Sequence, residues 1–320
     1  MSKKRILTGI KPSGDLHIGN YFGVIEPLLE LQEKGELFVF IANYHAQTSV
    51  HLKEELEKNT INILKLYLAA GLDPEKTTIY LQSDVPEVHE LAWIFSTLTT
   101  MPEIMRAHAF KDAQAKNKDI NVGTFYYPIL MAADIALFKA ELVPVGKDQI
   151  QHVEMAREMV RDFNKVYGDY LVEPQELVQK EVQTVPGTDG QKMSKSYRNV
   201  IPIVASDEEW KKAVFSIVTG STPLGEPLDT ESCNIFALHK LLSRDKLPEL
   251  ERRYKEGSIG YKESKEILLE SIKEKFGPIR EHFEALSDKE LWDKLKGGRE
   301  RVKDEARSTI AEIRKLSGLI

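Results

Sequence analysis

The chain has 320 residues, a formal net charge of −6, and 42% hydrophobic and 29% charged residues. This composition is ordinary for a soluble globular enzyme, and nothing in the overall charge would by itself attract nucleic acid. No apolar run approaches the roughly 18 residues of a membrane span and no signal peptide is apparent, so we expect a cytoplasmic protein without a membrane partner. The single cysteine, Cys233, excludes an internal disulfide and a multi-cysteine site within one chain, so we expect no iron–sulfur cluster.

Short apolar runs alternate with helical patterns through the first half of the chain. We expect strands at residues 5–8, 37–42, 77–82 and 142–145. We expect helices at 19–35, with Pro27 as a kink, and at 52–70, closed by Gly71 and Pro74. This alternation is typical of an α/β fold with a doubly wound parallel sheet of the Rossmann type, which binds ligands at the carboxyl ends of its strands.

The β-like runs stop at about residue 202, and the remainder reads as helix rich in lysine and glutamate. We therefore expect two domains, a nucleotide-binding catalytic domain at 1–180 and an all-helical domain at 197–320. Turn-forming residues at 186–190 predict a mobile loop, 186–196, at their junction.

Residues 9–20 read GIKPSGDLHIGN, which puts small residues and His17 where the first strand gives way to the first helix. Gly14 and Gly19 let the backbone approach a phosphate or an adenine closely, and a helix N-terminus favours negative charge. His17 can donate a hydrogen bond to a phosphate in a transition state. The alternative is a glycine-rich turn with a structural histidine, which an isolated segment of this kind would favour.

The second motif is KMSKS at residues 192–196. Lys192 and Lys195 each carry a compact charge on a flexible stem, which can follow the charge that develops on a departing pyrophosphate. The alternative is a solvated surface loop. The two motifs in this order indicate attack on the α-phosphate of ATP. Together they favour the functional interpretation of His17 over the structural one.

A third pattern lies in the helix predicted around residues 126–138. Tyr127, Met131 and Asp134 stand at i, i+4 and i+7, so they fall within about 60° of one another on one helix face. Asp134 is a carboxylate in an otherwise apolar helix and requires a donor. A lysine or a backbone N–H is the general alternative, and an indole N–H from a ligand is the functional one.

The segment 143–149 joins a strand to a helix at the edge where ligands are expected. Asp148 is a good helix cap, and a cap can also face a ligand. The basic stretch at 106–118 is a separate motif, and we expect it to form a solvated helix face. The alternative is that Lys111 contacts a phosphate or nucleic acid.

These motifs, together with MAADI at 131–135 and VPVGKDQ at 143–149, resemble those of the class I aminoacyl-tRNA synthetases, and their wording is similar to the bacterial-type tryptophanyl-tRNA synthetases. The resemblance implies activation of L-tryptophan with ATP and Mg²⁺, transfer to tRNA(Trp), a homodimer, and a helical domain that binds the anticodon. It implies catalytic roles for His17, Lys192 and Lys195 and no protein-bound metal. The residues implied at the ATP site are Lys11, Pro12, Ser13, Gly19, Asn20, Gly146, Lys147, Asp148, Val185, Lys192, Met193, Ser194, Lys195 and Ser196. Those implied at the tryptophan site are Gly9, His45, Tyr127, Met131, Asp134, Val143, Val145 and Gln149.

Three alternatives remain. A tyrosyl relative shares the fold and both ATP motifs, but the MAADI segment disfavours it. A small-metabolite adenylyltransferase would rarely need the helical region. A catalytically idle RNA-binding paralogue is disfavoured because His17, Asp134, Lys192 and Lys195 are intact.

Overall fold

The structure is a computed structural model that describes residues 3–319 except 13, 15, 108–120 and 179–184, and excepting the side chain of Asp148. Five strands form one parallel sheet in the order β3-β2-β1-β4-β5. Their bounds are β1 Arg5–Ile10, β2 Glu36–Ile41, β3 Thr77–Leu81, β4 Leu142–Val145 and β5 Gln175–Val178. The predicted Rossmann-type parallel sheet is confirmed, and the four predicted strands are present. Strand β5 was not predicted.

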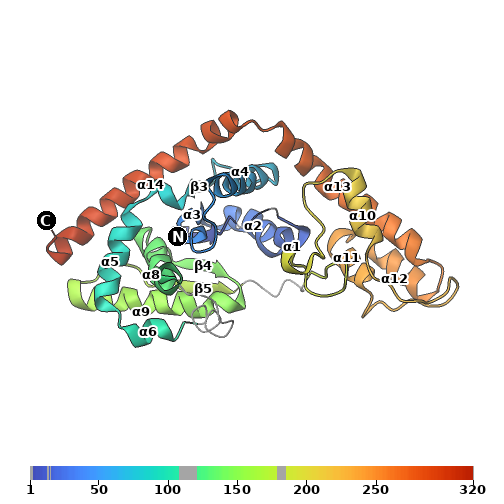
Figure 1. Ribbon diagram of the computed structural model, residues 1–320, viewed down its shortest axis with the longest axis horizontal. Coiled ribbons are helices and arrows are strands. Elements are labelled where there is room, and N and C mark those ends of the chain that lie inside the picture. The colour runs from blue at the N-terminus through green and yellow to red at the C-terminus, as the bar shows by residue number, and fades with distance from the viewer. Residues whose placement is uncertain (1–2, 13, 15, 108–120, 179–184, 320) are drawn as a thin grey trace.

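Helices cover both faces of the sheet (Figure 1). The bounds in the first part of the chain are α1 Ile18–Asn20, α2 Glu26–Lys34, α3 Asn43–Ala46, α4 Lys53–Ala69, α5 Glu87–Leu98, α6 Met101–Met105, α8 Val122–Leu137 and α9 Ile150–Tyr167. Strand β2 separates two cores, because alternate side chains of a strand point to opposite faces. Phe38 and Phe40 join α5, α8 and α9 in one core, whereas Val39 and Ile41 join α2 and α4 in the other.

The first helical segment after β1 is continuous but irregular. A π-helical turn at Tyr21–Ile25 lies between α1 and α2, and Pro27 stands in the first turn of α2. Proline has no N–H to offer the carbonyl of Gly23, four residues before it, and its ring would clash there in a regular α-helix. The widened turn accommodates Pro27. The predicted disturbance near Pro27 is therefore a π-helical turn just ahead of it.

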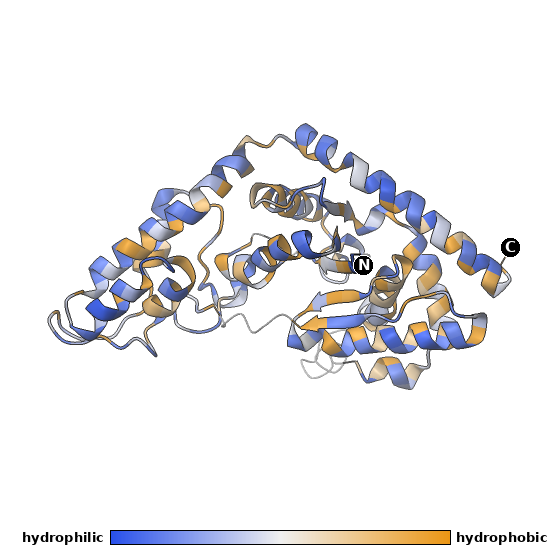
Figure 2. Cartoon of the chain, turned by 180° about the vertical axis from the view of Figure 1, so that it is seen from behind, coloured by the Kyte–Doolittle hydropathy of each residue, from blue (hydrophilic) through white to orange (hydrophobic). Residues whose placement is uncertain are grey.

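The rest of the chain is helical, as expected. The helices are α10 Asp207–Phe215, α11 Asn234–Leu242, α12 Leu247–Lys255, α13 Tyr261–Ala285 and α14 Asp288–Ser317. Trp210 of α10 and Phe276 of α13 are fully buried in the core that also covers one face of the sheet. Hydropathy colouring shows these helices with mixed apolar and polar faces (Figure 2). Among the described residues no helix is long and apolar enough to cross a membrane.

Helix α14 returns from the helical region to the sheet (Figure 1). Its first turns place Leu291 and Leu295 in the same core as α13, and its later turns place Val302 and Ile310 in the core with α5 and α8. The last helix thus belongs to both packing units. The proposed division of the chain at about residue 180 stays a prediction.

Candidate active site

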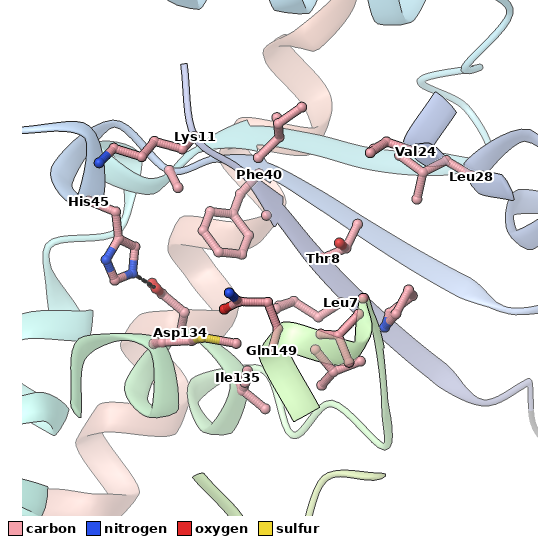
Figure 3. A pocket seen from close by; sticks show the side chains of 18 of the residues that line it. Leu7, Thr8, Lys11, Val24, Leu28, Phe40, His45, Asp134, Ile135 and Gln149 are labelled. Atoms are coloured by element: carbon pink, nitrogen blue, oxygen red, sulfur yellow. Dashed lines mark hydrogen bonds and ion pairs between the residues drawn. The ribbon is translucent and has the colours of Figure 1, made fainter. Parts of the chain in front are cut away.

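A cavity of about 420 Å³ opens at the carboxyl ends of β1 and β4. The strand order reverses between these two strands, which is where open parallel sheets bind ligands. Figure 3 shows side chains from β1, β2, α8 and the β4 segment converging on this space. All eight residues predicted for tryptophan line it: Gly9, His45, Tyr127, Met131, Asp134, Val143, Val145 and Gln149. Their binding role stays a prediction, since the geometry brings them together without a ligand.

Gly9 forms the part of the cavity floor that lies against Phe40. A Cβ at position 9 would lie 2.4 Å from the Phe40 ring, and Gly9 and Phe40 are register partners on β1 and β2. Glycine is required there because the aromatic ring occupies the space of a side chain. Phe40 therefore contributes an apolar wall to the cavity, a role that the sequence did not indicate.

Tyr127, Met131 and Asp134 lie on the cavity side of α8, as their spacing predicts. The Tyr127 hydroxyl donates to Gln149 Oε1 over 2.9 Å and lies 3.5 Å from Met131 Sδ. The His152 ring N–H contacts the same Gln149 oxygen over 2.9 Å. These contacts fix the orientation of the Gln149 side chain where it lines the cavity.

Asp134 is 2% exposed and finds its donors among side chains from two other elements. His45 Nε2 donates to Asp134 Oδ2 over 3.0 Å (Figure 3). Gln82 Nε2 donates to the two carboxylate oxygens over 3.1 and 2.8 Å. The protein partners are thus an imidazole and an amide rather than the lysine or backbone N–H considered from sequence. With two oxygens and about four acceptor sites, the carboxylate retains capacity for a ligand donor.

Gln82 was missed in the sequence, although it ends the predicted strand at 77–82. Its Oε1 accepts from the backbone N–H groups of Tyr44 and His45 over 3.0 and 3.2 Å. Because both partners are donors, the carbonyl must face them and the amide NH₂ must face Asp134. Gln82 is 1% exposed, so its orientation is fixed by its surroundings. The backbone of α3 therefore sets the direction of a donor to Asp134.

His45 and Lys11 border the same cavity on the β1 side (Figure 3). The His45 ring lies edge-on to Tyr127 at 4.9 Å between centroids, and its Nδ1 is buried without a hydrogen-bond partner among the described residues. Lys11 Nζ donates to Thr48 Oγ1 over 2.9 Å. Burial lowers the pKa of Lys11 from its ordinary value. The cavity thus combines apolar walls, one buried carboxylate and one cation at its border.

The two ATP motifs meet in space. The backbone N–H of Ile18 donates to the carbonyl of Ile201 over 2.9 Å, just beyond the KMSKS loop. Lys195 Nζ lies 3.4 Å from the position of a Cβ on Gly14. Burial, and then the charge of Lys195, lower the pKa of His17 to about 4. His17 is therefore a neutral imidazole at pH 7, beside an ammonium group that faces the same loop.

Asn199 holds the KMSKS loop together and was not predicted as a site residue. Its Oδ1 accepts from the backbone N–H of Ser194 over 2.8 Å. Its Nδ2 donates to Asp189 Oδ1 over 2.7 Å and to the carbonyl of Lys192 over 3.1 Å. Asn199 is 1% exposed, whereas Lys192 and Lys195 are exposed. The buried amide therefore anchors the loop that carries both lysines.

The residues predicted for ATP fall into three groups. Lys11 and Gly146 line the cavity. Val185 and Met193 are buried and joined by a backbone hydrogen bond of 2.9 Å from Met193 N–H to Val185 C=O. The others that the structure describes lie outside the cavity lining: Pro12, Gly19, Asn20, Lys147, Lys192, Ser194, Lys195 and Ser196. Ser13, the Asp148 side chain and Lys111 are outside the described residues.

The chemistry available here is charge stabilisation. Across the described part of the chain, no group of three or more histidine, cysteine, aspartate or glutamate side chains is arranged to hold a metal ion. The surface formed by the two ATP motifs carries Lys195 and a helix start that follows His17. Ammonium groups and backbone N–H groups of this kind stabilise phosphate charge without a covalent step.

Comparison with known proteins identifies the family of the chain. The family described as tRNA synthetases class I (W and Y) matches residues 2–277. A tryptophan–tRNA ligase of Campylobacter jejuni is 49% identical over 286 residues, covering 89% of this chain and 90% of the relative. One from Fusobacterium nucleatum is 45% identical over 99% of this chain and 98% of the relative. The crystal structure of the Campylobacter jejuni tryptophanyl-tRNA synthetase complexed with ADP and tryptophan superposes with a TM-score of 0.93 at 45% identity, covering 98% of this chain and 99% of that one.

Proposed function

The chain belongs to the class I tRNA synthetases of the tryptophan and tyrosine type, and from this premise we propose how it acts as a tryptophan–tRNA ligase. The observation that carries the proposal is a buried carboxylate, Asp134, in an apolar cavity at the switch point of the sheet. Cavities of about 300–1,000 Å³ with a few polar groups are the usual size for small ligands. Tryptophan fits this chemistry, because its indole is a large apolar ring with one N–H donor.

The indole occupies the space between Met131 and the β4 segment, and its N–H donates to Asp134. Gln82 and His45 hold the carboxylate ready for that bond, since both already donate to it. The polar end of tryptophan then faces Gln149 and Lys11, which also line the cavity. A phenol would offer a donor at a different distance from the ring centre, so tyrosine is the weaker ligand.

ATP binds beside the cavity, with its phosphates on the loop that contains Gly14 and His17. The carboxylate of tryptophan attacks the α-phosphate, and Mg²⁺ enters with the ATP as part of the substrate. Neutral His17 donates a hydrogen bond to the phosphate, and Lys192 and Lys195 stabilise the charge on departing pyrophosphate. Because none of these three side chains forms a covalent bond to the substrate, the rate depends on positioning and charge stabilisation.

The 3′-terminal adenosine hydroxyl of tRNA(Trp) takes the tryptophanyl group from the adenylate in the second step. The helical region α10–α14 carries the anticodon contacts on this proposal. We also propose that the enzyme acts in the cytoplasm, where ATP and tRNA are both supplied.

A homodimer is part of the proposal. Trp93 is 67% exposed on α5, and Met101 and Met105 on α6 are 62% and 48% exposed. Exposed large apolar side chains favour burial against a partner. Sedimentation of the purified protein measures the mass directly, and a Trp93→Glu variant is expected to sediment as a monomer if this face joins two copies.

The experiment that tests the function is ATP–pyrophosphate exchange with each of the twenty amino acids. Tryptophan alone should support exchange, because only its ring combines the required size with a single N–H donor. Exchange with tyrosine would favour the tyrosyl alternative. No exchange with any amino acid would favour the idle RNA-binding paralogue.

A further inference from the structure

Helix α14 lies directly on the edge strand of the sheet (Figure 1). Gly298 makes this approach possible, since a Cβ there would lie 3.3 Å from the Ile79 carbonyl oxygen and 3.4 Å from the Ile79 nitrogen. Such distances are tighter than ordinary van der Waals contact, so a larger side chain would push the helix outward. The C-terminal helix is thereby held against β3, the strand that ends just before Gln82.

The residue after Gly298 binds the turn that follows β3. Arg299 Nε donates to Asp84 Oδ2 over 2.7 Å, and its Nη2 donates to Asp84 Oδ1 over 2.6 Å. The Asp84 side chain is 6% exposed and that of Arg299 is 27% exposed. Hydrogen bonding to Asp84 raises the pKa of Arg299 above its ordinary value. A bidentate, largely buried pair fixes both position and orientation, which a single ammonium contact does not.

Asp84 in turn fixes the short helix Gln82–Asp84. Its Oδ2 also accepts from the backbone N–H of Leu81 over 3.0 Å, so the carboxylate closes the turn on itself while it binds Arg299. Gln82 begins the same turn and donates to both oxygens of Asp134. Hydrogen bonds therefore link Arg299 to Asp84 and Asp84 to Leu81, and the next residue in the chain, Gln82, binds Asp134.

We propose that Arg299 is a positioning residue for tryptophan, acting through Asp84 and Gln82 on the carboxylate that accepts the indole N–H. This rests on the proposed function. The C-terminal helix then contributes to amino-acid selection although it supplies no residue to the cavity lining. Loss of Arg299 leaves Lys303, whose Nζ is 3.9 Å from Asp84 Oδ1. That ammonium can offset charge, but it cannot replace the two parallel hydrogen bonds.

The same helix offers a matched control. Arg314 makes a bidentate pair with Glu90 of α5 at 2.7 and 2.6 Å. That pair also joins α14 to the catalytic part of the chain, but it does not contact the turn that contains Gln82. Arg299→Ala and Arg314→Ala therefore remove the same kind of bond from the same helix, and only the first is expected to affect the cavity.

The test is calorimetric titration of both variants with tryptophan and with the analogue that has sulfur in place of the indole nitrogen. Arg299→Ala should weaken tryptophan binding roughly 3- to 30-fold, a usual range for residues that act through neighbours. Its binding of the analogue should change less, so that the preference for tryptophan falls. The KM for ATP should stay the same, and Arg314→Ala should leave the preference unchanged.

Two further variants keep the test decisive. Asp84→Asn retains an acceptor for Leu81 but loses the carboxylate, and it should reproduce the loss of preference. If Arg299→Ala does not fold, Arg299→Lys replaces it, because a lysine keeps the charge but loses the two parallel hydrogen bonds. An unchanged preference in the Arg299 variants, or an equal loss in Arg314→Ala, would overturn the inference. If wild type itself fails to prefer tryptophan over the analogue, the proposed indole contact fails, and the role of Arg299 with it.

Discussion

A Cβ at position 187 would lie 2.2 Å from Asn199 Nδ2 and 2.7 Å from the Asn199 carbonyl oxygen. Gly187 and Asn199 therefore occupy one space that admits only one side chain. Asn199 fills it and uses the position to bind Ser194, Lys192 and Asp189. The geometry of the KMSKS loop depends on the absence of a side chain at Gly187.

Gly187→Ala should slow tryptophanyl-adenylate formation roughly 10-fold or more, because a displaced Asn199 moves the loop lysines by a fraction of an ångström to an ångström. Tryptophan affinity should be nearly unchanged, since the loop does not line the cavity. Stopped-flow adenylate formation and calorimetric titration measure the two quantities. Gly277→Ala in α13 is the control, because a Cβ there meets nothing within 4 Å, and it should leave the rate as in wild type.

Lys195→Ala should slow activation about 10²-fold or more while tryptophan affinity stays nearly intact, because the ammonium stabilises charge that develops only in the transition state. Pre-steady-state adenylate formation gives the rate. Lys211 is an exposed lysine on α10, and Lys211→Ala controls for the loss of a positive charge. An activation rate for Lys195→Ala equal to that of the control would remove the role assigned to the loop.

The same variant should change the titration of His17. Burial and then the Lys195 charge lower the pKa of His17 to about 4. In Lys195→Ala the second cause is lost and the first remains, so the pKa should rise but stay below its ordinary value. An NMR titration of the histidine ring measures this. A pKa that does not move would mean that Lys195 is not close to His17 in solution.

Asp134→Ala should weaken tryptophan binding by about 1.5–3 kcal/mol, roughly 10- to 150-fold, because a charge-assisted hydrogen bond to the indole is lost. The substitution also leaves His45 and Gln82 without their shared acceptor, and that effect is common to every ligand. The sulfur analogue has no indole N–H and should lose little beyond the common effect.

The coupling energy from the two ligands and two proteins separates these contributions. A value within error of zero would make Asp134 a scaffold residue, because tryptophan and the analogue would then weaken by the same factor. Calorimetric titration of all four pairs provides the energy directly.

Acidification should destabilise the fold through two buried histidines. Burial lowers the pKa of His239 to about 4, and the pKa of His17 is also about 4. Both stay neutral in the folded protein while the unfolded chain takes up protons near pH 6.5. Their contribution is therefore fully present above about pH 6.5 and is lost as the pH falls from 6.5 to 4. For fully buried His239 the loss is on the order of 3 kcal/mol.

Urea unfolding at pH 7 and pH 5 measures the part of this loss of stability that occurs above pH 5. His239 bonds Ser243 and Ser264 through its two ring nitrogens at 2.8 and 3.0 Å, so His239→Gln should keep part of that network and lower the pH dependence of stability. A variant with the full wild-type pH dependence would exclude His239 as a cause.

The sequence indicated the repeating elements because periodicity is a local property. Four strands follow from short apolar runs and the cavity face of α8 follows from side-chain spacing, and the structure confirms both. Strand β5 was not predicted because its side chains are half-buried to exposed and include Glu176, which pairs with Arg157. Nothing in its pattern separates such an edge strand from a loop, and only its pairing with β4 defines it.

The sequence by itself determined four of the five strands of the parallel sheet, the cavity face of α8 and the two ATP motifs. Tertiary structure alone decided which groups hold Asp134, since Gln82 and His45 lie 52 and 89 residues away along the chain. The Arg299–Asp84 pair spans 215 residues. Local spacing carries no information about such contacts, because they form only when segments far apart in the sequence pack together. Gly298 against Ile79 is the contact that made the last of them possible.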